Sequence, residues 1–398
     1  MLRSIRHERI EVNGFRPAST RHLQLLAPIA VLSIVLAASC APARTVDDVA
    51  SSPAATPAFG RAKLDIAYSF ISDSSLHRPT SGQLLRGAFE GMRTLVATVG
   101  GDASAASPAF TDDVGTNLDD FRKFAAAAGV LAAANPELTA NGLADAAIVG
   151  MIRADPDCHT YYVDEYGRNN DSRPVTRTGT GPQIPEGGIT ILGEPDQDGL
   201  QAKVLANGIA YVTWHAFEIV GTYKITDAVH AVLERSLAAG AKAWLFDLRG
   251  NIGGNGGDTM SSWFLDGQPT LRHTTRSGNP TTLSANRDVR LGPAYQLPIA
   301  IILNDRGGSA PEVFAASLKE NKRATIVGRT STGCLGGEND VPLGSDGSRL
   351  YVVQSELAGA VTGARFNNVG LTPDVPADDA SAVGAAAAVL IAKLADSP

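Results

Sequence analysis

From residue 208 onward the sequence alternates short apolar runs with amphipathic segments, and this alternation limits the fold more than any other feature. The apolar runs predict buried strands, and the segments between them predict helices. Strands are expected at 209–214, 243–248, 298–303, 325–328 and 348–357, and helices at 225–239, from 260, at 311–321 and at 382–394. Strands that alternate with helices favour a largely parallel sheet with helices on both faces. The predicted fold class is therefore α/β.

The segment before this alternation has a different pattern. Leu84, Ala88, Met92 and Leu95 recur at helical spacing, which predicts an amphipathic helix. Further helices are predicted at 117–134 and after a cap at 139 or 141. We therefore expect an N-terminal helical domain at 61–165. A connecting loop rich in Gly, Pro, Thr and Asn is expected at 166–207, and an α/β core at 208–398.

The first 40 residues have the features of an export signal. Five Arg against two Glu give this segment a charge of +3, and an apolar stretch leads to Ala37-Ala-Ser-Cys40. The small residues before Cys40 resemble the bacterial lipobox, at which the cysteine is lipidated; an ordinary secretory signal is the alternative. Residues 41–60 are predicted to be a linker. We expect a protein of the bacterial cell envelope, lipid-anchored outside the cytoplasm, or secreted if Cys40 is not lipidated.

Charge argues against a nucleic-acid partner. The whole chain carries a formal charge of −7, so the part after the +3 signal segment carries −10. The sequence shows no His and Cys cluster at metal-ligand spacing, and no metal or cofactor is predicted.

Three segments are candidates for chemistry, although each is weak alone. In the first, a strand leads through Gly307-Gly308 to Ser309 at a helix start, where a Ser is often only a helix cap. The second is the glycine-dense run 247–257, which lacks the Gly-Lys-Ser/Thr ending of a phosphate loop. The third places His159 in Asp155-Pro-Asp-Cys-His-Thr160, and a lone His is usually structural.

Together these segments resemble peptidase family S41, which includes the C-terminal processing and tricorn-type serine proteases. Asp247-Leu-Arg-Gly-Asn-Ile-Gly-Gly254, Ser309-Ala-Pro-Glu312, Asp157-Cys-His-Thr160 and Asn368-Val-Gly-Leu-Thr-Pro-Asp374 match its landmarks. The resemblance implies a ClpP/crotonase-like core with Ser309 as the nucleophile. It also implies an oxyanion hole made by the backbone N–H groups of Ala310 and of Gly253 or Gly254. Too few residues separate 162 from 208 for the PDZ module that many members carry.

The base differs from that of the processing proteases. Their lysine stands 25 positions after the serine, where this chain has Cys334. The tricorn-type pattern instead implies His159 as the base, with Asn367 at the position of the family's orienting Glu. His215 is a rival base, and a site without a base is the third alternative.

Cys158 and Cys334 are either a disulfide or two buried thiols, and the sequence leaves both open. The family positions imply that the two sulfur atoms lie close together. We expect a peptidase acting on peptide or protein substrates. The alternative is an inactive relative that binds peptides as a lipoprotein. An esterase is disfavoured because no Gly-x-Ser-x-Gly elbow is present. The oligomeric state is not predicted.

Overall fold

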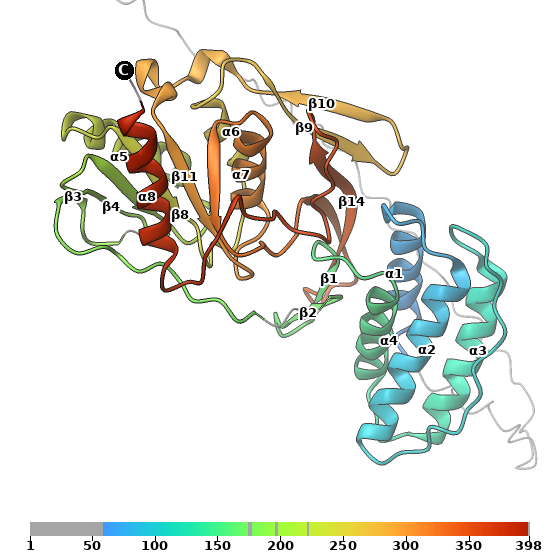
Figure 1. Ribbon diagram of the computed structural model, residues 1–398. Helices are drawn as coiled ribbons and strands as arrows, with labels where there is room; N and C mark the ends of the chain where they lie inside the picture. The colour runs from blue at the N-terminus through green and yellow to red at the C-terminus, as the bar shows by residue number, and fades with distance from the viewer. Residues whose placement is uncertain (1–58, 174–176, 196–197, 221–222, 397–398) are drawn as a thin grey trace, which may run out of the picture. The chain divides into compact units, whose positions relative to one another are not determined.

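A computed structural model describes residues 59–173, 177–195, 198–220 and 223–396 (Figure 1). The predicted signal segment with Cys40, and the linker up to residue 58, lie outside the described residues. Among the described helices, none combines the length and the apolar character that crossing a membrane requires.

The N-terminal part of the described chain is helical, as predicted. Its helices are α1 (Arg61–Ser74), α2 (Ser81–Thr98), α3 (Leu118–Ala134) and α4 (Ala140–Ala154). The last three begin at side-chain caps, because oxygens of Thr80, Asn117 and Thr139 accept hydrogen bonds from N–H groups of the first turn. These caps explain where the helices start.

Helices α2 and α4 approach each other through glycine. A Cβ on Gly150 of α4 would lie 2.0 Å from the carbonyl oxygen of Gly87 on α2. One on Gly91 would lie 2.1 Å from the carbonyl oxygen of Ala146. Only residues without a side chain allow the two backbones to come this close.

The core is a seven-stranded sheet in the order β15-β12-β11-β8-β5-β4-β3. Its strands are β3 (Ile189–Leu192), β4 (Gln201–Val204), β5 (Ile209–Thr213), β8 (Ala243–Asp247), β11 (Ile299–Leu303), β12 (Ala324–Gly328) and β15 (Val375–Pro376). Strands β5, β8, β11, β12 and β15 run parallel, whereas β4 and β3 add an antiparallel edge. The α/β fold predicted from the sequence is confirmed.

Helices cover both faces of this sheet, so its central strands are buried on both sides. Ala243 and Leu245 of β8 pack with helix α8 (Ala382–Ala395). Trp244 and Phe246, which point the other way, pack on the face that carries α5 (Ile225–Ala238), α6 (Gly257–Ser262) and α7 (Ala310–Glu320). This packing explains why the strands appear in the sequence as uninterrupted apolar runs.

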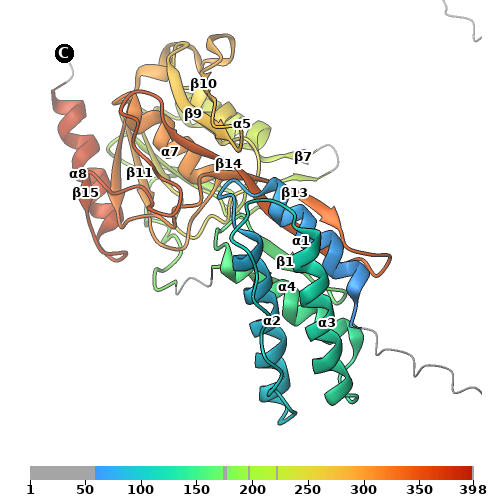
Figure 2. The same cartoon turned by 90° about the vertical axis from the view of Figure 1, so that its right-hand side faces the viewer.

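A second, antiparallel sheet connects the helical part to the core (Figure 2). It contains β1 (Tyr161–Val163), β2 (Asn169–Asp171), β9 (Pro269–Thr275), β10 (Pro280–Ser284), β13 (Gly336–Pro342) and β14 (Arg349–Gly359), and a separate hairpin pairs β6 (Ile219–Val220) with β7 (Tyr223–Lys224). Leu350 and Val352 of β14 and Tyr162 of β1 are buried in the same apolar cluster as the helices. Of this sheet, the sequence predicted only β14, because the hairpin of β9 and β10 is largely exposed and lacks a clear apolar alternation.

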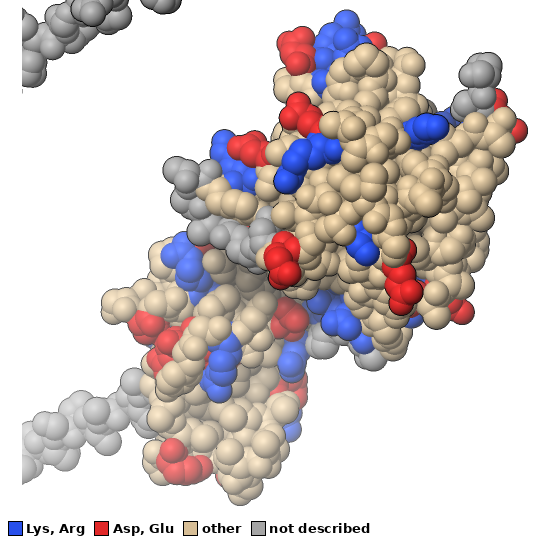
Figure 3. Space-filling view, turned by 90° about the vertical axis from the view of Figure 1, so that its left-hand side faces the viewer, with Lys and Arg blue, Asp and Glu red and all other residues tan. Residues whose placement is uncertain are grey.

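Charged side chains are mixed on the face shown in Figure 3. Lysine and arginine lie among aspartate and glutamate there, and do not gather into one basic area. On that face the described residues therefore present no field of a single sign.

Candidate active site

Ser309 stands on the tight turn between β11 and α7. Its backbone has φ 70° and ψ −121°, a region that residues other than glycine rarely adopt. An ordinary helix cap has extended backbone with negative φ. Such strain persists only where the surrounding structure holds it, and it is concentrated at functional sites. The conformation of Ser309 is therefore not explained by helix capping alone.

The carboxylate of Glu312 holds this turn in place. Its Oε2 accepts hydrogen bonds from the N–H groups of Ser309 (2.9 Å) and Cys334 (2.8 Å). Its Oε1 accepts from the N–H of Gly333 (2.7 Å) and from the hydroxyl of Ser331. The side chain is fully buried, and this burial raises the pKa of Glu312 even though four donors surround it. Glu312 thus ties the start of α7 to the loop that carries Cys334.

The glycine-rich loop packs directly against the serine. Gly253 has φ 95°, and a Cβ there would lie 2.7 Å from the Cβ of Ser309. The N–H of Gly253 donates to the side-chain oxygen of Asn251 at 3.0 Å, so it is not free to bind an oxyanion. Within the described chain, the N–H groups of Gly254 and Ala310 have no such partner. Of the three predicted donors, Gly254 and Ala310 therefore remain available and Gly253 does not.

His159 lies just after α4 and is 7% exposed. Its backbone N–H donates to Asp157 Oδ1 at 2.8 Å, which fixes the turn. Its ring Nδ1 is 3.4 Å from the sulfur of Cys158, and its Nε2 is 3.8 Å from Glu338 Oε2. In the part of the chain that the structure describes, no hydrogen bond joins His159 to Ser309. Catalytic hydrogen bonds of this kind often tighten only when substrate binds.

Asn367 does not contact the imidazole, contrary to the role predicted for it. Its side-chain N–H₂ group donates to Asp157 Oδ2 at 2.9 Å, and its oxygen accepts from the N–H of Leu335 at 3.1 Å. Asp157 is the group beside the ring, with Oδ1 3.7 Å from Nδ1 of His159. Burial opposes the charge of Asp157, but hydrogen bonds from His159 and Asn367 outweigh it and lower the pKa to about 2. A buried carboxylate therefore faces His159.

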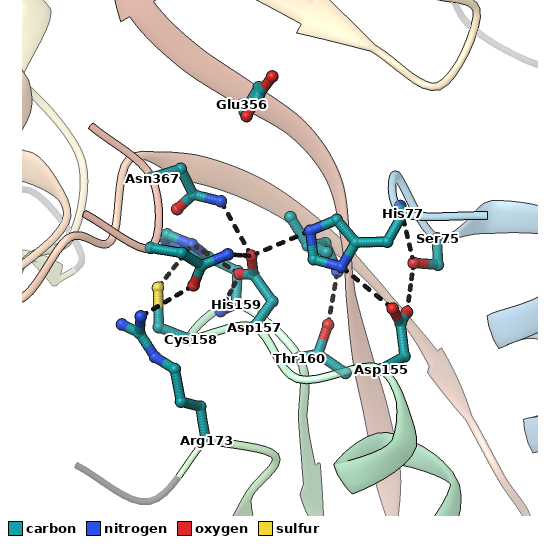
Figure 4. Close-up of polar contacts among 12 residues, drawn as sticks. Ser75, His77, Asp155, Asp157, Cys158, His159, Thr160, Arg173, Glu356 and Asn367 are labelled. Carbon is teal, nitrogen blue, oxygen red and sulfur yellow. Dashed lines mark hydrogen bonds and ion pairs between the residues drawn. The ribbon is translucent and has the colours of Figure 1, made fainter. Parts of the chain in front are cut away.

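His77 joins this network from the helical part of the chain, as Figure 4 shows. Its Nδ1 is 3.0 Å from Asp155 Oδ1, and its Nε2 is 3.5 Å from Asp157 Oδ2. The hydrogen bond to Asp155 raises the pKa of His77, against the opposing effect of burial. No local pattern selects His77, since it lies 78 residues before Asp155 and still farther from Asp157. Asp157 lies in the motif Asp157-Cys-His-Thr160, but the role of orienting His159 was predicted for Asn367.

The two cysteines meet at this site. A disulfide joins Cys158 to Cys334, 176 residues apart in the chain. It connects the turn that carries His159 to the loop held by Glu312. A Cβ on Gly308 would lie 3.2 Å from the Cβ of Cys334, so the second cysteine also packs against the Ser309 turn.

Ser309, His159 and both cysteines line one cavity of about 750 Å³. Gly254 also reaches this cavity, and its charged lining residues are Arg173, Arg177, Arg306, Asp171 and Glu338. The lining is mainly polar, and it offers both hydrogen-bond donors and acceptors.

His215, the rival base, lies elsewhere. It is exposed beyond the end of β5, and its N–H donates to the carbonyl of Asp198 at 2.6 Å. It does not line the Ser309 cavity. Asp247 and Arg249 form a buried ion pair of 2.7 Å under the glycine-rich loop, which supports the loop from below.

Comparison with known proteins points to one family of peptidases. Residues 208–377 match peptidase family S41, a segment that includes Ser309, Cys334 and Asn367 but not His159. A stretch of 175 residues is 27% identical to the carboxy-terminal processing protease CtpA of Bacillus subtilis, over 43% of this chain and 35% of that protein. A stretch of 188 residues is 27% identical to the chloroplastic carboxyl-terminal-processing peptidase 3 of Arabidopsis thaliana, over 46% of this chain and 34% of that protein. The matches span about a third of the length of these curated relatives.

A solved structure supports the fold. A lipoprotein from Streptococcus agalactiae aligns over 85% of this chain and 98% of its own, with a TM-score of 0.50 and 13% identity. At that identity the likeness concerns the fold alone. The sequence matches, and not this alignment, point to a family: the segment 208–377 of the chain is similar to peptidase family S41.

Proposed function

We propose that the protein is a serine peptidase that cleaves peptide bonds with Ser309 as nucleophile and His159 as base. One observation carries the proposal. A strained serine turn and a buried histidine line the same cavity, beside two backbone N–H groups that have no hydrogen-bond partner among the described residues. The similarity to family S41 supports the reaction class, and the cavity that Ser309 and His159 share supports the choice of residues.

In this mechanism the Ser309 hydroxyl attacks the carbonyl carbon of the scissile bond while His159 takes the hydroxyl proton. Asp157 lies on the Nδ1 side of the ring and stabilises the imidazolium, so Nε2 accepts the proton. The N–H groups of Ala310 and Gly254 bind the oxyanion of the tetrahedral intermediate. His159 then protonates the leaving amine, and water hydrolyses the acyl-enzyme by the same steps.

A predicted location at the cell envelope supports one class of substrate. We propose that lipidation of Cys40 anchors the protein at the cell envelope, so that exported peptides or proteins are its substrates. Metabolic labelling with an alkyne fatty acid should modify the wild-type chain but not Cys40→Ser. Equal labelling of the two proteins would contradict the anchor while leaving the peptidase untouched.

A fluorophosphonate probe tests the chemistry directly. Labelling should occur at Ser309 and fall by at least about 10³-fold in Ser309→Ala and in His159→Ala. Asp157→Asn should reduce the labelling rate at least about tenfold, because the amide cannot stabilise the imidazolium. His215→Ala serves as the control and should label normally. A folded wild-type protein that neither reacts with the probe nor cleaves a peptide library would favour the alternative, a peptide-binding lipoprotein.

A further inference from the structure

Three metal-binding side chains meet in the wall of the Ser309 cavity. The ligand atoms of Cys158, His159 and Cys334 all lie within 4.8 Å of one another. His159 is 7% exposed and Cys334 9% exposed, so solvent reaches them mainly through the cavity. The family positions implied that the two sulfur atoms lie close together, but no metal site was predicted from the sequence.

The two segments are held in place without the disulfide. The carboxylate of Asp157 accepts a hydrogen bond from the N–H of His159, and the backbone oxygen of Asp157 accepts one from the hydroxyl of Ser172. On the other side, Glu312 accepts the N–H groups of Gly333 and Cys334 at 2.7 and 2.8 Å. Because these anchors are independent of the sulfur–sulfur bond, breaking it leaves both cysteines next to His159.

The donor set fits a borderline-soft divalent cation. Two thiolates and one imidazole are typical ligands of Zn²⁺, and sites with three protein ligands keep an open position for water. All three side chains line the Ser309 cavity. Two thiolates cancel the charge of the ion, so the complex is neutral beside the guanidinium of Arg173, whose Nη2 is 3.9 Å from the Cys334 sulfur.

A carboxylate stands behind the histidine, as in many zinc sites. Nδ1 of His159 faces the sulfur of Cys158 at 3.4 Å, while Nε2 lies 3.8 Å from Glu338 Oε2. Ligating histidines commonly present their second ring nitrogen to a carboxylate, which orients the ring and strengthens the ligand. His159 therefore has one nitrogen toward the sulfurs and the other toward Glu338.

We propose that, once the disulfide is reduced, Cys158, Cys334 and His159 bind one Zn²⁺ ion in the wall of the Ser309 cavity. A dithiol reductant breaks the sulfur–sulfur bond, becomes a cyclic disulfide, and leaves two cysteine thiols. Zn²⁺ then replaces the two thiol protons, which are released to solvent. Oxidised protein has a disulfide at this position, and reduced protein has a metal site.

This site bears on catalysis if the proposed function is correct. A Zn²⁺ ion on Nδ1 leaves the proton on Nε2, so His159 has no lone pair to accept the proton of Ser309. Zinc would then inhibit the reduced enzyme. Metal binding itself does not depend on the proposed function and is measured separately.

The experiment uses the full chain, reduced with dithiothreitol and desalted without oxygen. Equilibrium dialysis against Zn²⁺ should give one tightly bound equivalent, and Co²⁺ in its place should give a thiolate-to-cobalt charge-transfer band. Cys158→Ser and Cys334→Ser should each weaken Zn²⁺ binding by about 100-fold or more and remove that band. Cys40→Ser, which changes the third cysteine of the chain, is the matched control and should bind Zn²⁺ as the wild type does.

The binding measurements decide whether the metal site exists. If the reduced wild type binds Zn²⁺ no better than Cys158→Ser, or if the cobalt band persists in both cysteine variants, the proposal is wrong. Fluorophosphonate labelling of the same samples separates the two proposals. Zinc binding without labelling of the metal-free protein would refute the peptidase and retain the metal site.

Discussion

Gly253 shows how closely one residue of the glycine-rich loop is fitted to the nucleophile. Any side chain there would meet Ser309, because the added Cβ would lie 2.7 Å from the serine Cβ. Gly250, in the same loop, also has positive φ (74°), but the nearest atom to its added Cβ is 3.9 Å away. Comparing alanine substitutions at the two positions therefore distinguishes the effect of a strained backbone from the effect of displacing the serine.

We expect Gly253→Ala to reduce fluorophosphonate labelling by about 10²-fold, since a displacement near 1 Å costs about that much. Gly250→Ala should label within a few-fold of the wild type. Both variants should lose about 1–2 kcal/mol of unfolding free energy from the left-handed backbone. Labelling rates and urea denaturation check this, and equal labelling of the two variants would contradict it.

His77 is the residue from which a pH effect is expected. Its raised pKa means that the folded state favours the protonated ring, which faces Asp155 and Asp157. This contribution to stability is fully present below the unfolded pKa of about 6.5 and is lost as pH rises through the higher folded pKa.

His77→Gln should therefore lower the unfolding free energy more at about pH 5.5 than at about pH 9. Urea denaturation at the two pH values measures the difference. His230→Gln is the control, because His230 on α5 packs against the ring of Trp263 and lies 3.8 Å from the exposed carboxylate of Glu234. A loss for His77→Gln that is the same at both pH values would show that its charge contributes nothing.

At the scale of elements, helix α7 is anchored at both ends by buried glutamates. Glu312 binds the loop at 331–334, next to the nucleophile. Glu320, near the other end, accepts the N–H groups of Val361 (3.0 Å) and Thr362 (2.8 Å). Both carboxylates accept backbone donors, but only the first contacts the active site.

Glu312→Gln and Glu320→Gln should each cost about 1–3 kcal/mol, because an amide N–H₂ would face donors that need an acceptor. Only Glu312→Gln should also impair labelling of Ser309, since it releases the turn that holds the serine. Denaturation and probe labelling of both variants test this. Impaired labelling in Glu320→Gln would point to a general loss of stability instead.

At the scale of the whole molecule, the helical part and the antiparallel sheet share one apolar cluster. Leu84 of α2 is fully buried in the cluster that also contains Leu350 and Val352 of β14. All three tryptophans of the chain, Trp214, Trp244 and Trp263, lie in the α/β core. Tryptophan fluorescence therefore reports the unfolding of the α/β core, while circular dichroism also reports the unfolding of the N-terminal helices.

Leu84→Ala should cost about 2–5 kcal/mol and shift the unfolding midpoints of fluorescence and circular dichroism together. Val130→Ala, an exposed change on α3 (63% exposed), should leave both midpoints nearly unchanged. If only the dichroism midpoint moves in Leu84→Ala, the helical part unfolds independently of the core.

Local patterns were enough to predict the α/β core and the helices before it. Strand β8 is a run of five buried residues between loops, and the cap at Asn117 marks a helix start; both signals lie within a few neighbouring residues. The antiparallel sheet was largely missed. Its exposed strands are held by pairing with β14, and pairing leaves little trace in local sequence.

The same division holds at the site. Ser309 and the glycine loop stood out in the sequence as contiguous motifs, but each was weak alone and only the family resemblance implied that they form one site. The sequence placed His159 in the site only through the family resemblance. The tertiary structure decided which groups surround the imidazole ring of His159. Asp157 lies beside the ring, and Asn367 donates a hydrogen bond to Asp157. From distant segments of the chain, His77 contacts Asp157 and Glu338 contacts the ring. Hydrogen bonds and charges act over a few ångströms in space, so only the folded chain determines which of these groups meet.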